Sequence, residues 1–95
     1  MEIKEIIDFC RSVKYSRSKY DVFKHLRNEV AELQEEIELE YAGGDSGPDG
    51  VVGEAVDVIL CALDLIAMHE PQVVDTDIKI IINKKLKKWV DNYDI

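Results

Sequence analysis

The chain has 95 residues and carries 20 acidic against 12 basic side chains, which gives a net charge of -8. A chain of this length buries only a limited core, so residues 1–95 are predicted to form a single domain, and association with further copies would bury more surface. The negative charge repels polyphosphate backbones and anionic headgroups, which argues against binding to nucleic-acid polymers or to a membrane surface.

The N-terminal residues and the cysteines bear on location. MEIKEIIDF is acidic and amphipathic, unlike a secretory signal peptide, and no apolar run approaches the length of about 18 residues that spans a membrane. Cys10 and Cys61 lie among apolar residues without metal-ligand spacing, so we interpret them as reduced thiols in the core. These features predict a cytoplasmic protein.

Four segments show the spacing of apolar residues by three and four that is typical of amphipathic helices. The predicted helices are about 3–13, 21–41, 51–69 and 74–89. The Gly-rich segment GGDSGPDG separates the two long helices, and Pro71 ends the third. The run IKIII could also fit a strand, but its neighbours favour a helix. The sequence therefore predicts an all-α chain of four helices, two of them long and antiparallel.

The third predicted helix carries charge among apolar residues. In GEAVDVILCALDLIA, residues 53–67, apolar side chains point in every direction, which is typical of a buried helix. Glu54 and Asp57 lie on one side, and Asp64 follows one heptad after Asp57 on the same side. Because carboxylates are rarely buried without a partner, a cation is expected to face this side. We expect Asp64 to cap the helix or to pair with a lysine.

The second predicted helix adds further carboxylates. Glu29, Glu32 and Glu36 follow one flank of its apolar stripe, and His25 lies one turn before them. Taken alone, glutamates at this spacing are most often a solvated helix face, and a single histidine is most often a surface residue. Their significance depends on what the neighbouring helix brings close to them.

Antiparallel packing of the two long helices would bring four carboxylates toward one place. These are Glu29, Glu32, Glu54 and Asp57. Four negative charges repel one another unless a divalent cation lies between them, and ligation by oxygen alone suits Mg²⁺ or Mn²⁺ rather than Zn²⁺ or copper. The sequence predicts a Mg²⁺ site. The alternatives are ion pairs to lysines, or a place for Glu54 and Asp57 at the wet edge of an oligomer interface.

The fourth predicted helix is basic. Lys79, Asn83 and Lys87 recur every four residues and share one stripe. An ammonium group and an amide on one stripe beside an acidic metal site are suited to hold phosphate groups. Lysines near a helix C-terminus are equally favoured by the helix dipole, so both interpretations stay open.

The order and spacing of these motifs resemble a known family. An ExxE motif in NEVAEL is followed, after a gap of 21 residues, by an ExxD motif in GEAVDV, and then by KIIINKKLKKW. Together they resemble the MazG-like all-α nucleoside triphosphate pyrophosphohydrolases over about residues 24–89. The resemblance implies hydrolysis of an NTP or dNTP to the monophosphate and pyrophosphate, for nucleotide-pool clean-up or regulation.

The resemblance also implies roles for individual residues and a mode of assembly. Glu29, Glu32, Glu54 and Asp57 would be Mg²⁺ ligands, and Lys79 and Asn83 would contact phosphates. Family members assemble as homodimers or homotetramers, in which helices from two chains complete a bundle.

The catalytic base and the remaining substrate contacts are inferred from residues near these positions. The family often has a further glutamate where this chain has Asn28, so any role of that glutamate in binding a second metal or acting as a base is lost. Glu32 or Glu36 would orient the attacking water as a general base. His25 and Lys87 are additional candidates for substrate contacts. Four aromatic residues are candidates for stacking on the nucleobase: Phe9, Tyr15, Tyr20 and Trp89.

Two rival functions remain open for this sequence. The chain could be a helical interaction module whose acids form salt bridges across subunits, or a nucleotide sensor of the same fold without turnover. In either case the apolar third helix predicts a homodimer, which we expected to bury the side with Val56, Leu60, Leu63 and Ala67.

Overall fold

The computed structural model describes residues 2–13, 16–44, 50–69 and 75–93. These residues form four helices and no strand, which confirms the all-α fold class. The helices are α1 (Ile3–Ser12), α2 (Lys19–Tyr41), α3 (Gly50–His69) and α4 (Asp75–Tyr93). The run IKIII is helical, as predicted. Pro71, Val74 and Tyr15 lie outside the described residues.

Both ends of α2 are fixed by local hydrogen bonds. The Ser18 hydroxyl accepts from the Asp21 N–H, and the Asp21 carboxylate accepts from the Ser18 N–H, each at 3.0 Å. This capping box begins the helix, and its hydrogen bonds lower the pKa of Asp21. After Tyr41, Gly43 adopts a φ of 77°, which favours glycine, and the chain leaves the helix there.

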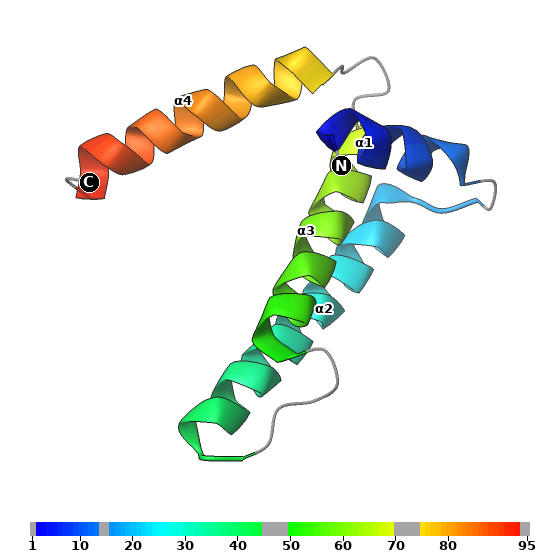
Figure 1. Ribbon diagram of the computed structural model, residues 1–95. Coiled ribbons are helices and arrows are strands. Elements are labelled where there is room, and N and C mark those ends of the chain that lie inside the picture. The colour runs from blue at the N-terminus through cyan, green and yellow to red at the C-terminus, as the bar shows by residue number, and fades with distance from the viewer. Residues whose placement is uncertain (1, 14–15, 45–49, 70–74, 94–95) are drawn as a thin grey trace.

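The two long helices form an antiparallel hairpin, and α1 packs across the C-terminal half of α3 (Figure 1). Ile7 of α1, Ala67 of α3 and Ile78 of α4 form a small buried cluster. Ala67 is therefore covered within the chain. Ala67 is thus not available to the dimer face that the sequence predicted to include it.

Burial of α3 is less complete than its composition suggests. Cys61 and Ala67 are its only buried residues, while Val52, Val56 and Ile59 are exposed. The reason is geometric, because α2 and α1 cover two sides of α3 and α4 turns away from it after its first turns (Figure 1). One chain does not supply enough helices to surround α3.

Within the described residues, no helix combines the length and the apolar character needed to cross a membrane.

Candidate metal centre

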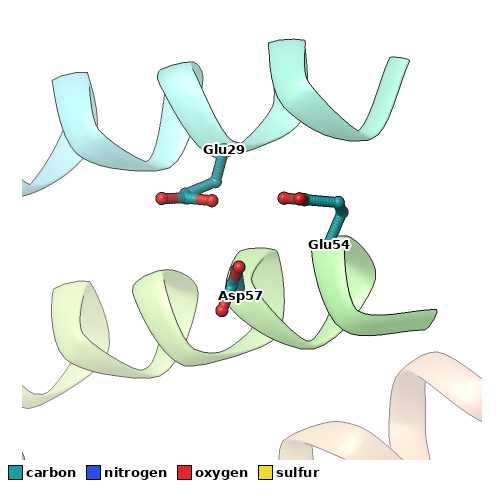
Figure 2. A group of neighbouring side chains, drawn as sticks. All are labelled: Glu29, Glu54 and Asp57. Carbon is teal, nitrogen blue, oxygen red and sulfur yellow. The ribbon is translucent and has the colours of Figure 1, made fainter. Parts of the chain in front are cut away.

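Three carboxylates from the hairpin converge in the space between α2 and α3. Glu29 comes from α2, while Glu54 and Asp57 come from α3 (Figure 2). One oxygen from each lies within 4.8 Å of the others, and all three residues are partly buried. The spacing of three residues places Glu54 and Asp57 on one side of α3, and antiparallel packing puts Glu29 opposite them.

The electrostatics of this cluster are unfavourable without a cation. The Glu29 side chain is 15% exposed, and its Oε2 atom is buried without a hydrogen-bond partner among the described residues. Burial raises the pKa of Glu29, and the neighbouring Glu32 and Asp57 carboxylates raise it further. The fold therefore holds negative charges together in a place where water cannot fully solvate them.

Glu32 and Glu36 lie on the same helix as Glu29 but differ from it in environment. Glu32 is exposed and lies outside the group of three oxygens, although it is close enough to raise the pKa of Glu29. Glu36 is buried. The structure thus brings together three of the four carboxylates predicted as ligands and leaves Glu32 at their solvent side.

His25 contacts the cluster from the preceding turn of α2. Its Nε2 lies 3.0 Å from Oε1 of Glu29, and its Nδ1 lies 3.7 Å from the Sγ of Cys61. The hydrogen bond to His25 lowers the pKa of Glu29, which opposes the effect of burial. The hydrogen bond from His25 therefore helps to orient the Glu29 carboxylate.

Asp64 forms an ion pair with a basic residue that was not predicted as its partner. The Arg17 guanidinium forms an ion pair with the Asp64 carboxylate and also donates to the Cys10 carbonyl at 3.1 Å. A cation for Asp64 was expected, but it is an arginine and not a lysine. Arg17 lies in the connector before α2, 47 residues away, and the only signal for it was a basic residue in a short polar connector.

A mainly apolar cavity of about 500 Å³ reaches His25, which contacts Glu29, and is also lined by the Arg17–Asp64 ion pair. Phe9 and Cys10 of α1 line it, together with His25 of α2 and Leu60 and Cys61 of α3. Both cysteines are free, and burial is the main cause of the raised pKa of each thiol. They are neutral thiols on the wall of this cavity, so the prediction of reduced core cysteines agrees with their surroundings.

The basic stripe of α4 is not brought to the carboxylates within one chain. Lys79 forms an ion pair with Glu2 at 3.4 Å, and Asn83 and Lys87 are exposed. The helix starts beyond the end of α3 that lies farthest from Glu54 and then diverges from α3 (Figure 1). A phosphate clamp from these residues would need a second chain or a movement of α4.

The donor set of the cluster fits a hard divalent cation. All three groups are carboxylates, and at least one buried oxygen, Oε2 of Glu29, has no partner in the described part of the chain. Mg²⁺ and Mn²⁺ prefer such oxygen ligands and keep further positions for water or phosphate. Comparisons with protein-family models, curated proteins and solved structures found no match for this chain.

Proposed function

We propose that this chain hydrolyses a nucleoside triphosphate, either NTP or dNTP, to the monophosphate and pyrophosphate in a Mg²⁺-dependent reaction that cleans up or regulates nucleotide pools. The observation that carries the proposal is the convergence of Glu29, Glu54 and Asp57 to within 4.8 Å. These residues belong to the ExxE and ExxD motifs that resemble those of the MazG-like enzymes.

The three carboxylates would hold the cation between α2 and α3. Mg²⁺, or Mn²⁺ in its place, supplies positive charge that attracts triphosphate oxygens and offsets the charge on the departing pyrophosphate. Holding the carboxylates in this arrangement before the metal binds reduces the reorganisation needed for binding. The raised pKa of Glu29 shows that the negative charge on this carboxylate is disfavoured in that arrangement.

We assign the role of general base to Glu32. It is exposed beside Glu29, so it can accept a proton from a water that attacks the α-phosphorus. The bond from the α-phosphorus to the bridging oxygen then breaks, and pyrophosphate leaves. Glu36 is a weaker candidate because it is buried.

The cavity that reaches His25 is suited to the nucleoside part of the substrate. It is mainly apolar and holds Phe9, which can stack on a planar base. His25 lies between this cavity and Glu29, so it would position the carboxylate next to the bound substrate. The proposal includes assembly as a homodimer or homotetramer, which gives Lys79, Asn83 and Lys87 a route to the phosphates of a neighbouring site.

A panel of NTPs and dNTPs with Mg²⁺, analysed for pyrophosphate and orthophosphate, tests the reaction. We expect pyrophosphate and a nucleoside monophosphate as primary products, and activity that is lost in EDTA. Orthophosphate as the primary product would refute attack at the α-phosphorus. Binding of a nucleotide with Mg²⁺ but without turnover would identify a sensor, and no effect of either ligand would favour a helical interaction module.

A further inference from the structure

Both cysteines of the chain lie on the wall of the cavity that reaches His25, and neither takes part in the proposed hydrolysis. Cys10 comes from α1 and Cys61 from α3, and both are free thiols. The two residues are far apart in the chain, so no local motif connected them. The packing of α1 on α3 places both thiols at one cavity.

His25 lies between Cys61 and the carboxylates. Its Nδ1 is 3.7 Å from the Sγ of Cys61, and its Nε2 is 3.0 Å from Oε1 of Glu29. With the carboxylate as acceptor, Nε2 carries the proton, and the Nδ1 lone pair of the neutral ring faces the sulfur. A histidine that binds a metal through one ring nitrogen usually donates the other N–H to a carboxylate or carbonyl in this way.

The distance from Cys61 to His25 matches a zinc site. Zn–S bonds are about 2.3 Å and Zn–N bonds about 2.0–2.1 Å, so a tetrahedral angle of about 109° places the two donor atoms about 3.5 Å apart. The observed 3.7 Å differs from this separation by only about 0.2 Å. The His25 side chain is 64% exposed, which gives an ion a path to both donors from solvent.

Cys10 is the source of a third donor, because it is the only other thiol of the chain. Its sulfur does not lie within 4.8 Å of both Cys61 Sγ and His25 Nδ1, since among the described residues only the three carboxylates converge so closely. It therefore reaches the ion by rotation of its side chain within the cavity. Two thiolates, one imidazole and a water make a four-coordinate set that zinc adopts in proteins.

The charge around the cavity favours a cation. Burial raises the pKa of Cys61, and the carboxylates of Glu29, Asp57 and Asp64 raise it further. The negative potential that opposes a bare thiolate attracts a divalent ion, and an ion bound to the sulfur displaces its proton. The same surroundings that keep Cys61 protonated in the metal-free chain thus stabilise a bound cation.

The type of donor separates these residues from the carboxylate cluster. Thiolate and imidazole groups suit Zn²⁺ and other thiophilic ions, whereas Mg²⁺ and Mn²⁺ prefer carboxylate oxygens. The two groups of residues are linked by the hydrogen bond from His25 to Glu29, but they share no donor atom. Mg²⁺ in excess should therefore occupy the carboxylates and leave the thiols for a softer ion.

We propose that Cys61 and His25, joined by Cys10, form a second metal site that binds Zn²⁺ or another thiophilic divalent cation on the wall of this cavity. Bonds form from the metal to Nδ1 of His25 and to the two sulfur atoms, and each thiol releases one proton to solvent. The site does not depend on the nucleotide chemistry or on an ion at the carboxylates.

Titration of the reduced chain with Zn²⁺ and with Cd²⁺, in the presence of excess Mg²⁺, tests the proposal. Calorimetry should show one ion bound per chain and the release of two protons, and Cd²⁺ should produce the ultraviolet charge-transfer band of a metal thiolate. Cys61→Ser should abolish tight binding, and Cys10→Ser should reduce the band by about half. His25→Gln should weaken binding by about a hundredfold, because it removes one donor.

His69→Gln is the matched control, since His69 is the only other histidine of the chain and is exposed on α3 away from the cysteines. It should bind Zn²⁺ as tightly as the wild type. A wild-type chain that gives no charge-transfer band with Cd²⁺, or that binds no more tightly than His25→Gln, would overturn the proposal. Zn²⁺ binding that excess Mg²⁺ abolishes would also contradict it, because the ion would then lie at the carboxylates. If Cys61→Ser fails to fold, the exposed His25 still provides the decisive variant.

Discussion

Two aspartates on the same side of α3 have opposite surroundings. Asp64 forms an ion pair with Arg17, so the chain itself supplies its counter-charge. Asp57, one heptad earlier, faces the carboxylates of Glu29 and Glu54. The first is a structural contact within the chain. The second faces only like charges in the cluster, and we propose that a cation from outside the chain binds there.

The two sites also differ in what they contribute to the fold. Arg17 joins the connector before α2 to both Asp64 and the Cys10 carbonyl, so it ties α1, α2 and α3 together. The carboxylates around Asp57 repel one another, which costs folding free energy while no cation lies between them. On this proposal, the contact that stabilises the fold and the site that binds a cation lie about two turns apart on one helix.

The largest expected effect comes from removing charge at the Asp57 site. Asp57→Asn or Glu54→Gln should reduce Mg²⁺-dependent hydrolysis by about a hundredfold or more, equivalent to roughly 2.7 kcal/mol of lost transition-state stabilisation. Without metal, the same variants should unfold at an equal or higher temperature, because a repulsion has been removed. Rate assays and thermal unfolding in EDTA measure the two effects.

Glu35→Gln is the control for this charge change, since Glu35 is exposed on another face of α2. It should leave both the rate and the metal-free stability close to wild type. If Asp57→Asn loses activity only because the chain unfolds, Asp57 resembles Asp64 and the distinction between the two sites fails.

A smaller effect is expected at the basic stripe of α4. If Lys79 and Asn83 contact phosphates, Lys79→Ala and Asn83→Ala should each lower kcat/KM by roughly ten- to a thousandfold. Lys84→Ala, on another face of α4, should change it little. Equal losses from Lys79 and Lys84 that disappear at high salt would indicate diffuse attraction in place of defined contacts.

The Asp64 site should respond in stability and not in catalysis. Arg17→Met leaves Asp64, whose side chain is 23% exposed, without its counter-charge, and should lower the free energy of unfolding by about 2 kcal/mol. Urea unfolding measures the loss, which Mg²⁺ should not specifically correct. If Asp64→Asn abolished Mg²⁺ binding in a folded chain, Asp64 would belong to the metal site after all.

The smallest effect is a pH dependence of the metal-free chain. Because the pKa of Glu29 in the folded state lies above its ordinary value of 4.5, the folded chain keeps a proton that the unfolded chain has released. The free energy of unfolding should therefore fall as pH rises from 4.5 through the raised pKa of Glu29. Above that raised pKa the loss of stability should be complete. Unfolding in EDTA across this range should show a fall in wild type that Glu29→Gln lacks.

The fold followed from the sequence where local signals dominate. The spacing of apolar residues and the Gly-rich segment predicted α2 and α3 to within two residues at their starts and at the same ends. Within one chain α3 is only partly buried, and its apolar residues on every side had indicated that three other short helices would not cover it. α1 and α2 leave several of its apolar residues exposed, among them Val52, Val56 and Ile59.

The candidate site was predictable in part. Helical spacing placed Glu54 and Asp57 on one side, and antiparallel packing then brought Glu29 to them. The partner of Asp64 was missed because Arg17 lies in an irregular connector, whose path depends on tertiary contacts and not on helical periodicity. The hydrogen bond from His25 to Glu29 could have been predicted, since the two residues are four apart on one helix.

Calorimetric titration of the chain with Mg²⁺, repeated with Mn²⁺, tests the central claim most directly. We predict saturable binding to the wild type, with a gain in stability of about 2.7 kcal/mol when the free ion exceeds its dissociation constant a hundredfold. Asp57→Asn should bind neither ion measurably, while Arg17→Met should still bind both. If the wild type binds neither ion, or if Asp57→Asn binds them as tightly as wild type, the carboxylates of α2 and α3 are not a metal centre.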